Sequence, residues 1–220
     1  MPESQNAQIM DTATKPDPVR GVDASPEYAE GYARTHIIPQ TFEYRLGYIW
    51  LLVIDSLLKD YVLLDVGCGT AGYHRLARNC KRIVGLDYSK TMIERGRVLL
   101  SELGLKSTEM ICGTFEGYLP TEQFDAVNLV GSIGRYTPWP GNEAALEKVR
   151  IILRPGGMAS FAFVRPRTVF QFLKAILFPR RTVVIRETRF KRMIQRAKLE
   201  LVLSIDIPGS MNTYVFCRSN

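Results

Sequence analysis

The sequence predicts an α/β fold built on a doubly wound and mostly parallel sheet, and two observations carry that prediction. Apolar runs of strand length alternate with segments of helical periodicity along the 220 residues, which implies parallel strands joined by right-handed crossovers. One of these runs, Tyr61 to Val66 in YVLLDVGCGTAG, ends in closely spaced glycines. An apolar run with such an ending is typical of a buried strand that opens into a ligand-binding loop.

The glycine loop and the strand after it predict a nucleotide cofactor. Gly67 and Gly69 permit a tight turn close to a ligand, and a helix expected over residues 71–78 would offer its first amides to an anionic group. The next apolar strand, in RIVGLDYS, ends at Asp87, about 20 residues after Gly67, where a carboxylate accepts the hydroxyls of a ribose. Gly67, Gly69 and Gly72 also satisfy G-x-G-x-x-G, so the spacing alone fits a dinucleotide as well.

The chain before the first strand divides into an arm and a helical cap. Residues 1–25 are polar and proline-punctuated, which predicts a flexible arm. Pro26 is expected to begin a helix, and the broad apolar face of residues 46–58 predicts a second helix that packs on the sheet. We assign residues 26–59 to this cap. An alternative is that long side chains of the cap reach over the ligand as a lid; these are Tyr28, Tyr32 and Arg45.

Helices and strands continue to alternate after Asp87. Ser89 is a good N-cap for a helix that Gly104 is expected to end. A later helix is expected to stop at Pro155-Gly156-Gly157, just before the fifth strand. The third, fourth and fifth strands are expected at residues 107–112, 124–130 and 158–164, and the later helix at residues 142–153.

The last part of the chain predicts a helix and a hairpin. Apolar residues at helical spacing mark a helix over residues 190–197. Residues 199–207 then alternate between large apolar and polar or smaller side chains, which is the pattern of a half-buried strand. Tyr214 to Cys217 supplies its partner after Pro208-Gly209.

Four motifs at the ends of these elements point to one family. DVGCGT contains the glycine loop, LDYS contains Asp87, FDAVNLVGS spans the fourth strand and its exit, and LRPGG precedes the fifth strand. Together they resemble the class I S-adenosylmethionine-dependent methyltransferases from Tyr61 to Cys217. The resemblance implies a Rossmann-like doubly wound seven-stranded sheet, mostly parallel with an antiparallel C-terminal hairpin strand, in one domain over residues 26–220. It implies S-adenosyl-L-methionine as the cofactor, whose ammonium and sulfonium suit the Asp65 carboxylate before the glycines.

The resemblance also implies which residues bind the cofactor. In many relatives the third strand ends in Gly-Asp, whose carboxylate accepts the adenine amino group. Here the corresponding residues are Gly113-Thr114-Phe115, so a hydroxyl acceptor and a ring for stacking take its place. The predicted cofactor-binding residues are Asp65, Gly67, Cys68, Gly69, Asp87, Tyr88, Met92, Thr114, Phe115, Val130 and Gly131.

The exit of the fourth strand is expected to face the transferable methyl, because ligands lie beyond the carboxyl ends of parallel strands. Arg135 and Tyr136 are predicted to orient the acceptor, with a purely structural role in the loop as the alternative. No catalytic residue is assigned, since a carboxylate acceptor needs no general base; the candidates are His36 and Tyr136. His74 is expected to have a structural or cofactor-adjacent role. We predict methyl transfer to an oxygen or nitrogen of a small molecule, with an apolar acceptor as one alternative.

Two other functions compete with this interpretation. A short-chain dehydrogenase would need a Tyr-x-x-x-Lys pair, and none of the ten tyrosines has a lysine four residues on. An RNA-binding methyltransferase would use the basic segment of residues 165–198, in which eleven Lys or Arg face Glu187 as the one acid. That segment carries large aliphatic groups in place of interleaved aromatics and glycines, so nucleic acid is not the expected partner. No metal is predicted, because the four cysteines form no C-x-x-C pair.

An amphipathic segment is predicted as an insertion over residues 165–182, before the last helix. Its apolar face includes Val169, Phe172 and Leu173, and arginines flank it on both sides. The segment either packs on its own domain or caps an apolar acceptor and rests on an anionic membrane. No apolar run is long enough to cross a bilayer. We therefore expect a cytoplasmic protein, with peripheral contact at the inner face of a membrane through residues 165–181 as the alternative.

Overall fold

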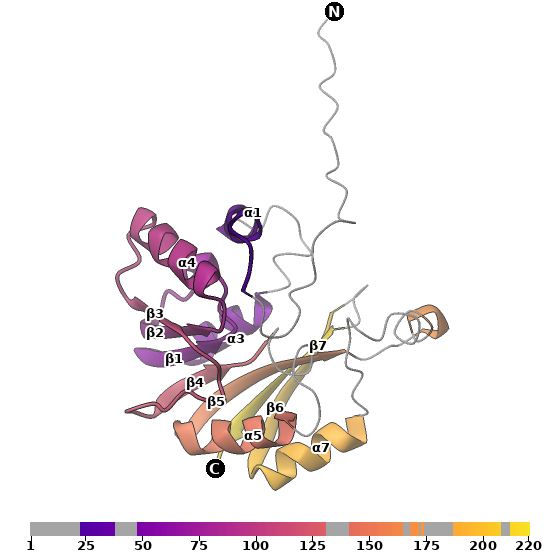
Figure 1. Cartoon of the computed structure of the whole chain (residues 1–220). Helices are drawn as coiled ribbons and strands as arrows, with labels where there is room; N and C mark the ends of the chain where they lie inside the picture. Colours follow the sequence, from indigo (N-terminus) through magenta and orange to yellow (C-terminus); the bar gives the residue numbers. More distant parts are fainter. Residues whose placement is uncertain are drawn as a thin grey trace, which may run out of the picture.

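The computed structural model describes residues 23–37, 48–130, 141–164, 168–171, 173, 187–207 and 212–220. Within them a seven-stranded sheet runs in the order β3-β2-β1-β4-β5-β7-β6 (Figure 1). Strands β1 to β5 are parallel to one another, whereas β7 is antiparallel to both β5 and β6. The predicted fold class is therefore confirmed, including the antiparallel C-terminal hairpin.

The bounds of the elements agree with most of the predicted ranges. The strands are β1 (Tyr61–Val66), β2 (Cys80–Asp87), β3 (Thr108–Cys112), β4 (Phe124–Asn128), β5 (Leu153–Val164), β6 (Leu199–Asp206) and β7 (Asn212–Ser219). The helices are α1 (Pro26–Ile37), α3 (Ile49–Leu57), η2 (Gly72–Leu76), α4 (Lys90–Glu102), α5 (Gly141–Ile152) and α7 (Glu187–Arg196).

Side chains of β1 alternate between two apolar cores on opposite faces of the sheet. Val62 and Leu64 lie in a cluster with residues of α5 and α7, whereas Leu63 lies in a second cluster with residues of α3. All six residues of β1 are buried, as expected for an inner strand covered on both faces. Asp65 is in register with Asn128 of β4. The carboxyl ends of neighbouring strands therefore meet at one edge, where the glycine loop begins.

The helix predicted after the glycine loop is wrong in type and length. We expect an α-helix over residues 71–78, but the structure has the short 3₁₀-helix η2. Ala71 precedes it in the left-handed conformation with φ 56°, which costs a residue other than glycine about 1 to 2 kcal/mol. Tyr73 and His74 of η2 both turn inward to Asp65. Side-chain bonds to a buried carboxylate thus hold this segment, and hydrophobic periodicity does not reveal them.

The start of β5 is a second correction. The strand begins at Leu153, which pairs with Phe124, and not at Met158. A register shift between Phe124 and Ala126 accommodates the Pro155-Gly156-Gly157 turn within the strand. The turn predicted to separate helix from strand is therefore an irregularity inside β5.

The burial of β6 also differs from the prediction. Leu199 is buried, but Leu201 and Leu203 are 41% and 40% exposed. β6 is the edge strand of the sheet, and its register with β7 shifts between Leu201 and Leu203. This irregularity interrupts the simple alternation of the two faces. The strand is largely exposed after its first residue.

The folded structure begins before the predicted end of the N-terminal arm. Ser89 Oγ donates to Asp23 Oδ1 at 2.5 Å and accepts from Ala24 N at 3.3 Å. Residues 23–25 are therefore attached to the start of α4, and residues 1–22 lie outside the described residues. Among the helices of the described residues, none is sufficiently long and apolar to cross a membrane.

Candidate cofactor site

Asp87 ends β2 beside the glycine loop, as predicted, and two backbone amides hold its carboxylate. Gly69 N donates to Oδ2 and Ser89 N donates to Oδ1, both at 2.9 Å. A carboxylate offers about four acceptor positions, so each oxygen can accept one further donor such as a ribose hydroxyl. Burial raises the pKa of Asp87, and the two amide bonds oppose that shift. Asp87 is thus an anchored and partly desolvated acceptor.

Asp65 lies fully buried beneath the loop, where three side chains surround its carboxylate. Tyr73 donates its hydroxyl to Oδ2 at 2.5 Å, and His74 Nε2 contacts the same oxygen at 2.6 Å. Asn128 Nδ2 donates to Oδ1 at 2.6 Å. Because Asp65 is fully buried, the ammonium group of a bound cofactor would be attracted by the charge of this carboxylate from a distance, without a direct hydrogen bond to its oxygens.

The same network reaches the exit of β4. Asn128 Oδ1 accepts from Ser160 Oγ at 2.7 Å and from Val130 N at 3.1 Å. The amide of Asn128 therefore joins Asp65 on one side to Val130 on the other. One buried chain of hydrogen bonds links the glycine loop with the exit that we expect to face the transferable methyl, and such chains make both ends rigid.

The glycine loop has the backbone geometry that its sequence predicts. Gly67 and Gly69 have φ of 77° and 56°, a region that glycine enters without steric cost. The side chain of Cys68 packs against β2, because a Cβ added at Gly85 would lie 2.9 Å from its sulfur. Burial raises the pKa of the Cys68 thiol. Cys68 therefore packs in the core as a neutral thiol, and its backbone forms the loop.

Two further predicted cofactor residues lie around the loop and Asp87. Tyr88 is 43% exposed and directly follows Asp87. Met92 is buried on α4, and its terminal carbon would lie 3.2 Å from a Cβ added at Gly69. The structure therefore brings the Met92 side chain to the loop, and the assignment of Tyr88 stays a prediction.

The two residues predicted for adenine differ in their surroundings. Thr114 Oγ1 accepts from Gly117 N at 3.2 Å, and its proton remains available to a ligand. Phe115 is buried in the core shared with α5, and the Lys148 ammonium lies 5.0 Å from the centre of its ring. These contacts account for Phe115 as a core residue and argue against the predicted stacking on the base.

The residues predicted for the acceptor lie outside the described part of the chain. Gly131, Arg135 and Tyr136 fall in residues 131–140, which the structure does not describe. His36 belongs to the last turn of α1, but its side chain is not among those described. Their assignments remain predictions.

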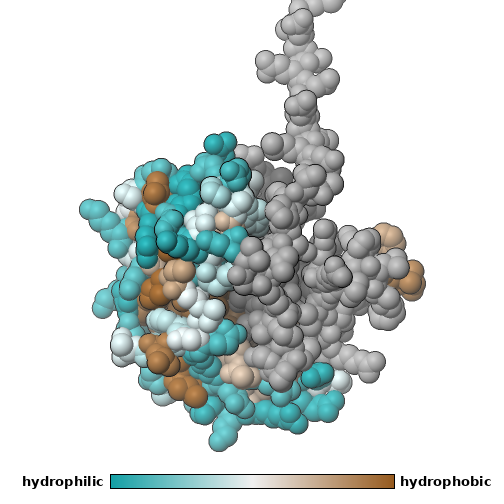
Figure 2. Space-filling model, viewed as in Figure 1, coloured by the Kyte–Doolittle hydropathy of each residue, from teal (hydrophilic) through white to brown (hydrophobic). Residues whose placement is uncertain are grey.

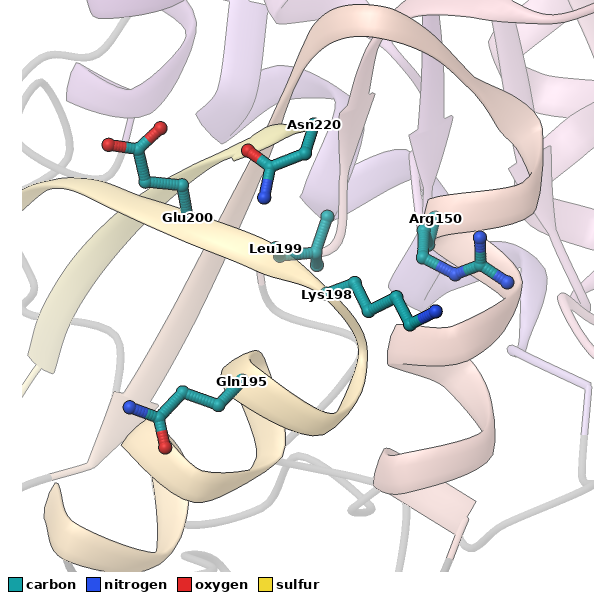
Figure 3. A pocket seen from close by; sticks show the side chains of 6 residues that line it. All are labelled: Arg150, Gln195, Lys198, Leu199, Glu200 and Asn220. Atoms are coloured by element: carbon teal, nitrogen blue, oxygen red, sulfur yellow. The ribbon is translucent and has the colours of Figure 1, made fainter.

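A shallow pocket lies at the opposite end of the sheet (Figure 3). It is formed where Leu199 begins β6, next to the C-terminal residue Asn220. Ligands of open parallel sheets bind beyond the carboxyl ends of the strands, so this pocket is not the predicted site. The pocket is lined by Arg150, Gln195, Lys198, Leu199, Glu200 and Asn220.

Within the described residues, His, Cys, Asp and Glu side chains form no group of three that could hold a metal ion.

Two side chains that follow the glycine loop contain buried polar atoms. Thr70 Oγ1 and His74 Nδ1 have no hydrogen-bond partner among the described residues, although both residues are buried. Leaving such a group unpaired costs about 1 to 3 kcal/mol. Independently of these two atoms, the open acceptor positions of Asp87 make this edge of the sheet suitable for the hydroxyls of a nucleoside cofactor.

Comparison with known proteins shows a methyltransferase domain in part of the chain. Residues 63–157 match the family described as "Methyltransferase domain", and this range contains the glycine loop, Asp87 and Asn128. NodS, the N-methyltransferase of Bradyrhizobium japonicum WM9 solved with S-adenosyl-L-homocysteine, superposes with a TM-score of 0.65 at 16% identity, over 87% of this chain and 98% of that one. At this identity the likeness shows the fold.

Two curated proteins are similar over part of the chain. The probable cobalt-precorrin-6B C(15)-methyltransferase (decarboxylating) of Methanocaldococcus jannaschii is 32% identical over 78 residues, which are 35% of this chain and 43% of that protein. The tRNA U34 carboxymethyltransferase of Cellvibrio japonicus is 32% identical over 127 residues, 56% of this chain and 39% of that protein. The chain thus spans less than half the length of either relative.

Residues 63–157 therefore match a methyltransferase domain, and the fold is shared with the methyltransferase NodS. Both findings agree with the predicted class I S-adenosylmethionine-dependent methyltransferase.

Sequence reasoning missed most of the network around Asp65. It gave no role to Tyr73, Asn128 or Ser160, and for His74, which contacts Asp65, it expected a structural or cofactor-adjacent role. Asn128 carries the signal that was available. It is a polar residue at the carboxyl end of a buried strand, at the same edge of the sheet as Asp65.

Binding of the cofactor is expected to release protons under mildly acidic conditions. Burial raises the pKa of Asp87 in the free protein, and two ribose hydroxyls would favour its charged form and lower that pKa again. Affinity for S-adenosylhomocysteine therefore falls as the pH drops through the raised pKa of Asp87. Calorimetric titrations in buffers with different ionisation enthalpies measure the released protons, and the variant Asp87→Asn is expected to release none.

Proposed function

We propose that this chain transfers a methyl group from S-adenosylmethionine to an oxygen or nitrogen of a small molecule. The observation that carries the proposal is the arrangement at the glycine loop. Asp87 is anchored with acceptor positions to spare, and the fully buried Asp65 lies behind the same loop. Two carboxylates in a partly desolvated site favour a cofactor with a net positive charge.

The residues of the chain have mainly to bind and orient the reactants. The cofactor supplies a methyl carbon that its sulfonium activates for in-line displacement. Asp87 would hold the ribose, the loop backbone would approach the methionine part, and Asp65 would fix the loop and the β4 exit through Asn128. Positioning and exclusion of water supply most of what such a displacement needs from a protein.

The same geometry disfavours a dinucleotide cofactor. A dinucleotide places its diphosphate on the N-terminus of a helix, whose dipole and free amides stabilise the charge. Here the loop leads into η2, which has only five residues, and the buried Asp65 carboxylate adds negative charge below the loop. An oxidoreductase is therefore not our proposal.

The function is tested by following a labelled methyl group. The purified chain is incubated with methyl-labelled S-adenosylmethionine and, in parallel, with small-molecule, RNA and protein fractions of a cell lysate. We expect label in a product of the small-molecule fraction, and none with the Asp87→Ala variant. Label confined to the RNA fraction would contradict the proposal and would favour the basic segment as a nucleic-acid surface.

We also propose that the inserted segment binds an apolar and anionic surface such as a membrane. Val169 and Phe170 are 77% and 76% exposed, and Leu173 is 50% exposed. They lie in residues 168–171 and 173, the orange piece at the right of Figure 1, which is brown in Figure 2. Packing on its own domain would bury Val169 and Leu173 of the predicted apolar face, and the structure exposes both. Exposed apolar groups in a strongly basic segment suit an interfacial contact.

Binding to anionic vesicles is expected to depend on these exposed side chains. In co-sedimentation with vesicles of phosphatidylserine and phosphatidylcholine, the wild type is expected to bind at low salt and to dissociate as salt screens the charges. The double variant Phe170→Ser, Leu173→Ser is expected to lose about tenfold or more in vesicle affinity because it removes most of the apolar insertion. Val98→Ser, an exposed apolar residue of α4, is the matched control. Failure of the wild type to bind at low salt would contradict the membrane contact.

A further inference from the structure

Tyr32 of α1 lies directly on the glycine loop. A Cβ added at Gly69 would lie only 2.9 Å from Tyr32 Cε1 and 3.3 Å from Cζ, so the ring touches the glycine face itself. The amide of that same glycine donates to Asp87. The ring therefore contacts Gly69, and Gly69 binds Asp87, the carboxylate that we expect to hold the ribose.

The surroundings of Tyr32 suit contact with a cationic ligand. Burial raises the pKa of its phenol, and the nearby Tyr48, Tyr28, Asp87 and Asp65 act in the same direction. The phenol thus stays protonated and acts as an aromatic and hydrogen-bonding surface, not as a base. An aromatic face in negative surroundings attracts a sulfonium or ammonium group through its ring electrons.

Two contacts with α4 hold α1 in this position. Asp23, just before α1, accepts from Ser89 Oγ at 2.5 Å and from Thr91 N at 3.1 Å. Within α1, Glu30 accepts from Arg95 Nε at 2.6 Å. Since α4 begins immediately after the Asp87 turn, these contacts tie α1 to the ribose end of the site.

We propose that Tyr32 is a cofactor-binding residue, whose ring forms the wall of the site opposite the sheet, above Gly69. This inference rests on the proposed function and extends it to the N-terminal cap. It also gives Gly69 a second reason to be glycine: any side chain there would push Tyr32, and α1 with it, away from the loop. Helix α1 therefore covers the cofactor and slows its release.

The neighbouring Tyr28 provides a matched control. It lies one turn earlier on α1, with its ring centre 6.2 Å from that of Tyr32. Replacement of either ring by Ala removes a similar aromatic surface from the same helix. A purely structural role of the tyrosines in holding α1 would make the two replacements alike, whereas contact with the cofactor makes them differ.

Calorimetric titration with S-adenosylhomocysteine tests the proposal. Tyr32→Ala is expected to weaken binding by about tenfold or more, whereas Tyr32→Phe, which keeps the ring, and Tyr28→Ala are each expected to stay within about threefold of the wild type. Equal affinities of Tyr32→Ala and Tyr28→Ala would overturn the proposal. If the wild type itself fails to bind, the proposed function fails instead.

A second measurement does not depend on the folding of the Tyr32 variant. Gly69→Ala leaves Tyr32 intact but displaces its ring, so it is expected to lose affinity as Tyr32→Ala does. Tryptic cleavage after Arg34, whose side chain is 76% exposed, reports the opening of α1. At concentrations that saturate each protein, S-adenosylhomocysteine is expected to slow this cleavage in the wild type and to leave it unchanged in Gly69→Ala. Equal protection in both proteins would contradict the covering role.

Discussion

Replacement of Asp87 by Ala is expected to lower the affinity for S-adenosylhomocysteine by about a hundredfold or more. Each oxygen of Asp87 has room for one ribose hydroxyl beside the amide that it already accepts. Hydrogen bonds to a charged group contribute about 1.5 to 3 kcal/mol each. Losing two of them accounts for the expected effect, which titration calorimetry measures directly.

Asp125→Ala is the matched control for this variant. Asp125 Oδ2 also accepts a backbone amide, Val62 N at 2.8 Å, but it belongs to the opposite end of the sheet, at the start of β4. We expect Asp125→Ala to lose some stability and to keep wild-type affinity. An Asp87→Ala protein that is folded and binds as tightly as the wild type would refute the ribose assignment.

Replacement of Asp65 by Asn is expected to destabilise the fold by about 3 kcal/mol. The NH2 group of the new amide cannot accept hydrogen bonds, so it would face side chains that now donate to the carboxylate. For a domain of this size that loss lowers the melting temperature by roughly 6 to 12 °C. Cofactor affinity is expected to fall less than in Asp87→Ala, since Asp65 is fully buried behind the loop. Thermal unfolding followed by circular dichroism provides the measurement.

Tyr73→Phe removes one donor from the same network and leaves the carboxylate with His74 and Asn128. We expect a loss of about 1.5 kcal/mol from this change. If Asp65→Asn melted at the wild-type temperature, Asp65 would not have the anchoring role that its contacts indicate.

Much of the fold was predictable because burial repeats with a fixed period along each element. The continuous apolar run of β1 indicated an inner strand, and the cap at Ser89 located α4, where its hydroxyl accepts from Met92 N. Asp87 was predictable too, since the end of β2 and the spacing from Gly67 are both visible in the sequence. Local sequence patterns were therefore sufficient to predict β1, the start of α4 and the position of Asp87.

The rest depends on contacts between distant segments, which no local pattern encodes. Tyr73 is held by a carboxylate from the preceding strand, Asn128 by its register with β1, and Asp23 by Ser89, 66 residues away. The core position of Phe115, which argues against its expected stacking, was hidden for the same reason, because the tertiary fold places Lys148 of α5 over its ring. The exposure of β6 likewise depends on its position at the edge of the sheet, which is set by the order of the strands.

Calorimetric titration of the wild-type chain with S-adenosylhomocysteine and, in parallel, with NADH tests the central claim most directly. The loop, the anchored Asp87 and the buried Asp65 predict saturable binding of S-adenosylhomocysteine to each chain and no binding of NADH. Binding of NADH without binding of S-adenosylhomocysteine would contradict the assignment of the site to a methyl-donor cofactor.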